Sequence, residues 1–317
     1  MLKKLLLSTL FLAAAVVPAA GKDLKVLMIG NSFSICVGIY LPSVVKSVPG
    51  NRLELTSAYI GGCTLEKHCK NLEKAENKPD FKPYRINVWS SDSPAKALKN
   101  YKGNVNELLK KNQYDVVTIQ QGSRQSWDYK YYQPYADQLV AYIRKHQPEA
   151  EIVIQQTWAY RCDHPNLKPN PKARWDFDQA GMYERVRDSY RKLAEAHHFR
   201  VIPMGDAVQL FRKYTPVKFQ PAAEDEFKYP AVPSSAGDVV GQASWRKNAK
   251  SGEMQLKYDQ FHLNATGHYL QACLWFAALY GEPVSKIQFA PKSMKPELKT
   301  LLHKCAQEAL DQYVQAK

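Results

Sequence analysis

Several features that define large protein classes are scarce in this sequence of 317 residues. After the first twenty residues no stretch is apolar enough to cross a membrane, so we expect no stable membrane insertion. The six cysteines form no C-x-x-C pair and no Cys/His cluster with zinc-ligand spacing, and the sequence predicts no metal site. Their low density excludes a disulfide-rich scaffold, although Cys63 and Cys69 are close enough along the chain to pair.

Acidic residues are also in the minority. The chain has 44 Lys and Arg against 30 Asp and Glu, a formal charge of +14, and loss of Lys3 and Lys4 would leave +12. Such an excess favours acidic partners, for example an anionic polysaccharide or a membrane surface. The basic residues are dispersed instead of forming one block with interleaved aromatics, so general solubility is the preferred interpretation and we expect no nucleic-acid partner.

The N-terminus has the pattern of a secretory signal peptide. Lys3 and Lys4 precede an apolar run over residues 5–17, and Pro18, Ala19 and Ala20 supply the small residues of a cleavage site. We therefore predict that residues 1–20 are a signal peptide and that the protein is exported, to the periplasm or beyond. An uncleaved membrane anchor and a buried N-terminal helix are the alternative interpretations.

The remaining chain alternates between predicted strands and helices. Apolar runs predict strands at 24–29, 53–58, 115–120, 151–155 and 200–203. Helical spacing of apolar residues occurs at 104–111, 135–146, 177–197 and 296–313. This alternation is typical of βαβ units, so we expect an α/β fold: a three-layer α/β/α sandwich with a parallel sheet of about five strands. One domain would span residues 24–285, and residues 286–317 would form a helical extension packed on it.

Two segments, residues 66–100 and 215–257, lack this pattern. The first is polar and basic, and the second is rich in Pro, Gly, Ser and Lys. Loops of such length are usually lids or binding loops. A mobile insertion without a role is the alternative for each.

Two short motifs carry the residue types of nucleophilic catalysis. Ser32 follows the first predicted strand in Gly30-Asn31-Ser32, where a tight turn exposes a hydroxyl. Asp259 and His262 lie three positions apart near the C-terminus, in a predicted turn before a helix. A serine hydroxyl needs an imidazole to take its proton, and the imidazole needs a carboxylate to hold its tautomer. Taken alone, Ser32 can be a helix N-cap, and Asp259 and His262 can be a surface Asp and a loop His. Taken together, the two motifs predict Ser32 as nucleophile, His262 as base and Asp259 as the orienting acid.

Two further strand ends offer donors for an oxyanion. The pair Gly61-Gly62 follows the second predicted strand, where a backbone N–H can approach a ligand closely. The run Gln120-Gln121-Gly122 follows the third, where a side-chain amide can donate. Taken alone, the Gly pair is better interpreted as a simple turn, and the alternative for the Gln run is a polar strand terminus.

Together these blocks resemble the SGNH/GDSL hydrolase superfamily over residues 25 to about 280. Its G-D-S or G-N-S motif corresponds to Gly30-Asn31-Ser32, and its D-x-x-H motif to Asp259 and His262. Its usual G-x-N-D block is replaced here by Gln120-Gln121-Gly122-Ser123. The segments 29–34, 59–63 and 157–160 are similar to an exported bacterial subgroup of unassigned substrate, DUF4886-like.

The resemblance implies a flavodoxin-like sandwich and a serine esterase that needs no cofactor. Its oxyanion hole would consist of the N–H groups of Ser32 and Gly62 with the amide of Gln121. The expected substrate is an ester on a small molecule or glycan, with O-acetylated carbohydrate preferred. Further candidates for substrate binding are Asn31, His68, Trp158 and Tyr160. A non-catalytic glycan-binding protein and an acyltransferase with the same triad are the alternatives.

Overall fold

A seven-stranded sheet forms the centre of the molecule in the computed structural model, which describes residues 21–222 and 226–315. The strand order is β4-β3-β2-β1-β5-β6-β7, and the five strands from β2 to β7 in that order run parallel. The antiparallel β3 and β4 extend one edge. The strands are β1 (Asp23–Gly30), β2 (Arg52–Tyr59), β3 (Tyr84–Ser90), β4 (Lys99–Gly103), β5 (Val116–Ile119), β6 (Glu151–Gln155) and β7 (Arg200–Ile202).

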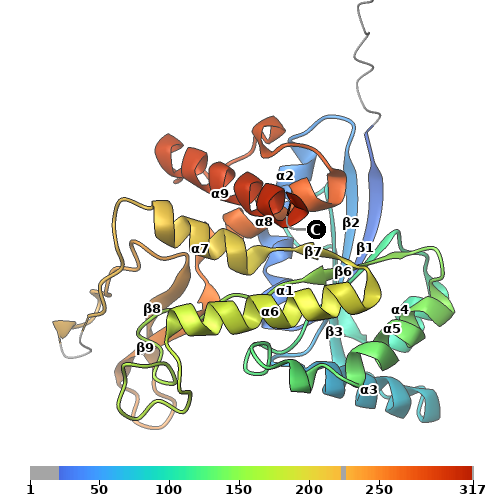
Figure 1. The fold of residues 1–317 in the computed structure, drawn as a ribbon, viewed down its shortest axis with the longest axis horizontal. Helices are drawn as coiled ribbons and strands as arrows, with labels where there is room; N and C mark the ends of the chain where they lie inside the picture. Colours follow the sequence, from blue (N-terminus) through green and yellow to red (C-terminus); the bar gives the residue numbers. More distant parts are fainter. Residues whose placement is uncertain (1–20, 223–225, 316–317) are drawn as a thin grey trace, which may run out of the picture.

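Helices cover both faces of this sheet, so the three-layer α/β/α prediction is confirmed. In Figure 1, α2, α8 and α9 gather on one side, and α3, α4 and α5 on the other. The helices are α1 (Ser32–Ile35), α2 (Val37–Lys46), α3 (Leu65–Asn77), α4 (Val105–Lys111), α5 (Tyr135–His146), α6 (Gln179–His197), α7 (Met204–Tyr214), α8 (Ala265–Tyr280) and α9 (Pro296–Gln315). Short 3₁₀ turns lie at η1 (Tyr129–Tyr131) and η3 (Val284–Lys286).

The register of the parallel strands brings three strand ends together. Gly30, the last residue of β1, is opposite Tyr59, the last residue of β2. On the other side of β1, Ile29 is opposite Ile119, where β5 ends. The segments that follow these strands therefore leave the sheet at one edge, as expected for an open α/β fold.

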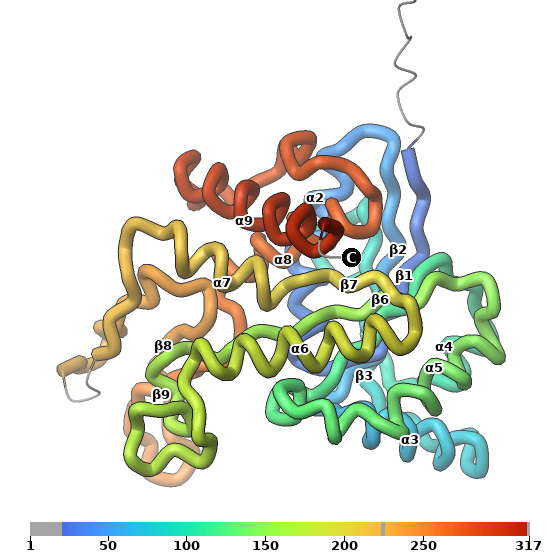
Figure 2. The backbone as a smooth tube through the Cα atoms, in the orientation of Figure 1, coloured from blue at the N-terminus to red at the C-terminus, as the bar shows by residue number. Residues whose placement is uncertain are grey.

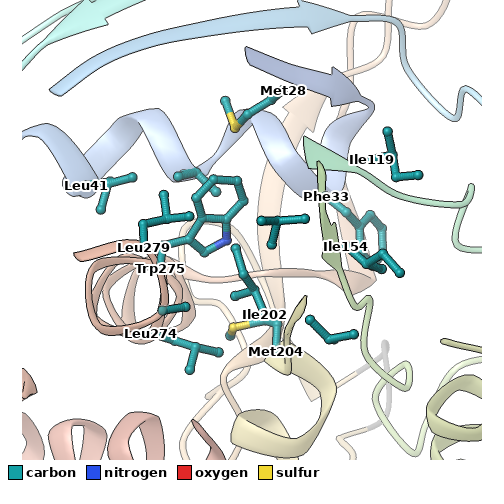
Figure 3. Packing of buried hydrophobic residues seen from close by; sticks show 14 of the residues in the cluster. Met28, Phe33, Leu41, Ile119, Ile154, Ile202, Met204, Leu274, Trp275 and Leu279 are labelled. Carbon is teal, nitrogen blue, oxygen red and sulfur yellow. The ribbon is translucent and has the colours of Figure 1, made fainter. Parts of the chain in front are cut away.

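The core on one face of the sheet is built around α8. Thirteen of its sixteen residues are buried, because it lies between α2, α9 and the sheet. Figure 3 shows Trp275 of α8 directed toward Leu41 of α2 and Met28 of β1. Burial of an aromatic side chain of this size contributes about 2–3 kcal/mol. The packing holds in place the segment just before α8, which carries His262.

The segment 66–100, which we predicted to be a long loop, contains regular structure. It holds most of α3, all of β3 and the start of β4. Helix α3 buries one face and exposes its Lys and Glu residues, which gave the segment its loop-like composition. In β3, Tyr84 and Ile86 alternate with exposed Arg85, the period-two signal of a half-buried strand. The parallel sheet has the expected five strands, but the full sheet has two more.

The segment 215–257 also contains an element that we did not expect. Strands β8 (Val240–Lys247) and β9 (Met254–Leu263) form an antiparallel hairpin beside the main sheet. In the backbone trace the hairpin lies next to the loop that precedes α6 (Figure 2), and Gln260 Nε2 donates to the Asp163 carbonyl at 2.9 Å. Because β9 leads directly into α8, the hairpin carries Asp259 and His262.

Helix α9 packs against α7 and α8 and buries Leu302, Cys305 and Ala309 among others. All six cysteines are free, so Cys63 and Cys69 do not pair as we considered. No helix within the described ranges is both long and apolar enough for a membrane span. The predicted signal peptide lies outside the described residues.

Candidate active site

Ser32 occupies the first turn after β1. Asn31 caps α1, since its Oδ1 accepts from the N–H of Phe33 at 3.0 Å, and Ser32 is the first helical residue. Gly30 makes the turn possible, because a Cβ at this position would lie 2.3 Å from the Ser34 Oγ. The Ser32 side chain is consequently presented at the edge of the sheet and remains partly exposed.

Ser32, His262 and Asp259 form a continuous chain of hydrogen bonds. The Ser32 Oγ lies 2.8 Å from the His262 Nε2, and the His262 Nδ1 lies 2.7 Å from the Asp259 Oδ2. Both distances are normal for hydrogen bonds. With Nδ1 donating to the carboxylate, Nε2 is left as the acceptor for the serine proton. The structure thus brings together the three residues that the sequence singled out as a triad.

The Asp259 carboxylate is fixed by its own neighbourhood. Its Oδ1 accepts from the backbone N–H groups of Phe261 and His262 at 3.2 and 3.0 Å. Burial raises the pKa of Asp259, but the hydrogen bonds from the His262 ring and these N–H groups outweigh burial and hold the pKa below its ordinary value. The carboxylate therefore stays ionised. Asp259 and His262 lie at the end of strand β9 and not in the turn that the sequence predicted.

Ser32 and His262 line a pocket of about 550 Å³. Its walls come from the segments after β1, β2 and β5 and from the end of β9. The lining residues are Ser32, Tyr59, Gly61, Gly62, Thr64, Gly122, Ser123, Arg124, Gln125, Phe261 and His262. Among the described residues no group of three or more His, Cys, Asp or Glu side chains is placed to hold a metal ion.

Two backbone N–H groups are available in this pocket. The N–H of Ser32 lies in the first turn of α1, where no acceptor exists within the helix. Gly62 has φ +61°, a left-handed conformation that favours glycine, and its N–H has no acceptor in the described part of the chain. Nothing lies within 4 Å of the position that a Cβ on Gly62 would take. This open face and the free N–H suit a donor to a developing oxyanion.

Gln121 does not line the pocket, contrary to our expectation that its amide would donate to an oxyanion. Its side chain is fully buried, and its Oε1 accepts from the N–H groups of Leu65 and Gly122 at 3.0 and 2.8 Å. Its Nε2 donates to the Tyr131 carbonyl at 2.8 Å. Both ends of the amide are thus used to fasten the start of α3 and η1 to the end of β5. Gln121 is a scaffold residue.

Asn31 is a buried positioning residue and does not line the pocket, contrary to its predicted place in substrate binding. Its side chain is 1% exposed, and its Nδ2 donates to the Cys63 carbonyl at 2.9 Å. Its Oδ1 accepts from the Gln120 Nε2 at 2.6 Å as well as from the N–H of Phe33. One buried amide therefore ties together the loops that carry Ser32 and Gly62 and the end of β5.

Trp158 and Tyr160 also lie beneath the site instead of lining it. Trp158 is fully buried, stacks on Phe33 with ring centroids 4.2 Å apart, and donates from Nε1 to the Phe261 carbonyl at 2.9 Å. It thereby supports the residues next to Ser32 and His262. Tyr160 is 2% exposed, and its hydroxyl lies 2.8 Å from the Ser123 Oγ. The predicted sugar platform is wrong for both.

His68 likewise does not line the pocket. It is fully buried in α3, and its Nδ1 lies 2.8 Å from the Tyr84 hydroxyl. Burial, aided by the charge of Lys67, lowers the pKa of His68 to about 3, so the ring is neutral. Our prediction placed His68 in an open basic loop, whereas it lies inside a helix.

Several pocket residues were not singled out from the sequence. Tyr59 ends β2, and Phe261 lies between Asp259 and His262 on β9. Arg124 and Gln125 follow the polar run at the end of β5. Arg124 and Gln125 could have been predicted as pocket residues, because they follow a parallel strand and such segments meet at the carboxyl edge of the sheet.

The chain belongs to the family described as Domain of unknown function (DUF4886), whose model matches residues 25–226. A comparison with the curated proteins finds no match. Among solved structures, the chain is similar to a DUF4886 family protein from Bacteroides uniformis, with 26% identity and a TM-score of 0.69. That similarity covers 91% of this chain and 95% of the other.

Two further solved structures match with lower identity and a lower TM-score. A candidate SGNH hydrolase from Slackia heliotrinireducens is 15% identical with a TM-score of 0.46, over 81% of this chain and all of the other. A candidate GDSL-like lipase from Parabacteroides merdae is 14% identical with the same TM-score, over 82% and 96% of the two chains.

Proposed function

We propose that this protein is an SGNH-type serine hydrolase that cleaves ester bonds, with O-acetyl groups on carbohydrate as its substrates. The observation that carries the proposal is the hydrogen-bonded chain from Ser32 through His262 to Asp259, at 2.8 and 2.7 Å. It lies at the wall of an open pocket that also contains the free N–H of Gly62. Nucleophile, base, orienting carboxylate and oxyanion donors are the parts that acyl transfer requires.

The reaction would proceed in two steps. His262 accepts the proton of Ser32 as its Oγ attacks the ester carbonyl, and the imidazolium is stabilised by Asp259. The N–H groups of Ser32 and Gly62 hold the oxyanion, and each such donor lowers the barrier by about 2.7–4 kcal/mol. His262 then protonates the departing alcohol, and a water molecule activated by the same ring releases the acyl group from Ser32.

A glycan ester is favoured as the substrate for two reasons. The pocket is open to solvent and mixes hydroxyl and amide groups with the rings of Tyr59 and Phe261, a surface suited to a sugar. The N-terminal sequence pattern also favours export, which would expose the enzyme to glycans outside the cytoplasm.

The non-catalytic alternative loses its support. It depended on Gln121 as a sign that the oxyanion hole had decayed, but the Gln121 amide fastens backbone groups of three segments. Its presence therefore carries no information on loss of catalysis.

The test is hydrolysis of p-nitrophenyl acetate by wild type, Ser32→Ala and Ser93→Ala, followed by release of acetate from acetylated glycosides. Ser93 is an exposed serine outside the pocket and serves as the matched control. We expect Ser32→Ala to lose essentially all activity and Ser93→Ala to keep it. Equal, slow turnover by wild type and Ser32→Ala would contradict the proposal.

A further inference from the structure

Arg124 is the one permanently charged side chain that lines the pocket among the described residues. It is exposed, and it makes no hydrogen bond or ion pair with any residue that the structure describes. Arg161 and Arg212 behave differently, because Arg161 is buried, Arg212 is largely buried, and each is paired with an aspartate, Asp163 and Asp238 respectively. The guanidinium of Arg124 thus keeps all of its donors for another molecule.

No acidic side chain of the described residues lines the pocket to neutralise Arg124. The carboxylate next to the catalytic residues, that of Asp259, is held by His262, and that of Asp163 is paired with Arg161. The positive charge at the pocket wall is therefore uncompensated, which raises the local concentration of anions.

Two further cationic residues contact residues that line the pocket. Arg85 of β3 is exposed and lies 4.6 Å above the ring of Tyr59, which lines the pocket. Lys67 lies in the first turn of α3, and its N–H donates to the hydroxyl of Thr64, another lining residue. Lys67 has no ion-pair partner among the described side chains. Arg124, Arg85 and Lys67 thus come from three separate segments that border or contact the lining residues.

Arginine presents a planar fork of donors that matches a carboxylate in two parallel hydrogen bonds. Resting on the proposed function, we propose that the acetylated sugar is acidic and that Arg124 binds its carboxylate. The acetyl group itself has no charge, so within an O-acetyl ester the negative charge has to lie on the sugar. Arg124 then selects uronate-like esters over neutral ones and orients them against Ser32.

The test compares two esters that differ only in charge. One is a methyl glucuronoside with a single O-acetyl group, and the other is the methyl glucoside acetylated at the same position. Acetate release gives kcat and KM for wild type, Arg124→Gln and Arg124→Lys. Arg246→Gln is the matched control, because Arg246 is exposed on β8 and does not line the pocket.

We expect wild type to prefer the glucuronoside by about 10- to 100-fold in kcat/KM, mostly through KM. Arg124→Gln should lower that ratio to near one, Arg124→Lys should keep part of it, and Arg246→Gln should keep all of it. As a second readout, the Ser32→Ala variant should bind the glucuronoside more tightly in calorimetry than the Ser32→Ala/Arg124→Gln double variant does.

The outcomes separate the two proposals. Hydrolysis of both esters at equal efficiency, with full dependence on Ser32, would overturn the role of Arg124 and leave the esterase in place. A preference for the glucuronoside that survives in Arg124→Gln would also overturn it. If wild type hydrolyses neither sugar ester nor p-nitrophenyl acetate, both proposals fail.

Discussion

Removal of the Asn31 side chain should damage both the stability and the activity of this protein. In Asn31→Ala, α1 loses its cap, at a cost of about 0.5–2 kcal/mol. The Gln120 Nε2 and the Cys63 carbonyl lose their buried partner, at about 1–3 kcal/mol each. The free energy of unfolding should therefore fall by about 2.5–8 kcal/mol.

The effect on catalysis follows from what Asn31 connects. Without its amide, the Ser32 turn is no longer fastened to the loop that carries Gly62. Loss of one oxyanion donor typically lowers kcat by about 10²–10³-fold, and we expect a fall in kcat of that size with a smaller change in KM. Asn31→Asp keeps the two acceptor contacts but loses the bond to Cys63, so it should lie between wild type and Asn31→Ala.

Asn104 provides the matched control. It is also a buried cap, with its Oδ1 accepting from Glu107 and its Nδ2 near the carbonyls of Pro79 and Phe81. Urea unfolding should show a large loss of stability for both alanine variants, whereas p-nitrophenyl acetate turnover in the folded range should fall only for Asn31→Ala. If Asn31→Ala loses stability but keeps kcat within about twofold of wild type, the positioning role is refuted.

Three further predictions follow from the ionisable groups. Asp259→Asn should lower kcat about 10⁴-fold, because an amide in this place favours the wrong tautomer of the ring, and a steady-state assay with folding checked by circular dichroism would show it. His68 has a pKa of about 3 in the folded protein, below its unfolded value of about 6.5. Its contribution to the free energy of unfolding is therefore complete above about pH 6.5. That contribution falls by up to about 1.4 kcal/mol per pH unit between pH 6.5 and 3. Urea unfolding at pH 7 and 5 should show a shallower loss in His68→Gln than in wild type. Asp238→Ala leaves the buried Arg212 without its partner and should cost about 3–5 kcal/mol, whereas Glu66→Gln, which breaks an exposed pair, should change the melting temperature little.

The parallel half of the sheet could be predicted because its strands are buried on both faces and read as apolar runs. β1 and β5 are examples, with continuous burial over their carboxyl halves. The edge strand β4 could not be found in this way, since four of its five residues are exposed and its sequence is polar. The hairpin β8–β9 was missed for a related reason: its two strands are only half buried and alternate weakly.

The difference between Ser32 and Gln121 shows where sequence reasoning on the site reaches its limit. A triad is defined by residue types at the ends of elements, and the order of parallel strands places Ser32 and the segment after β2 at one edge. The direction of an amide is set instead by which backbone groups lie nearby, and for Gln121 those include Leu65 and Tyr131, to which the sequence assigned no element. Arg124 was overlooked because its role depends on groups that are missing around it, not on groups that are present. Its proposed role as an anion-binding group depends on the lack of an acidic side chain in the pocket lining, which can be seen only in the folded structure.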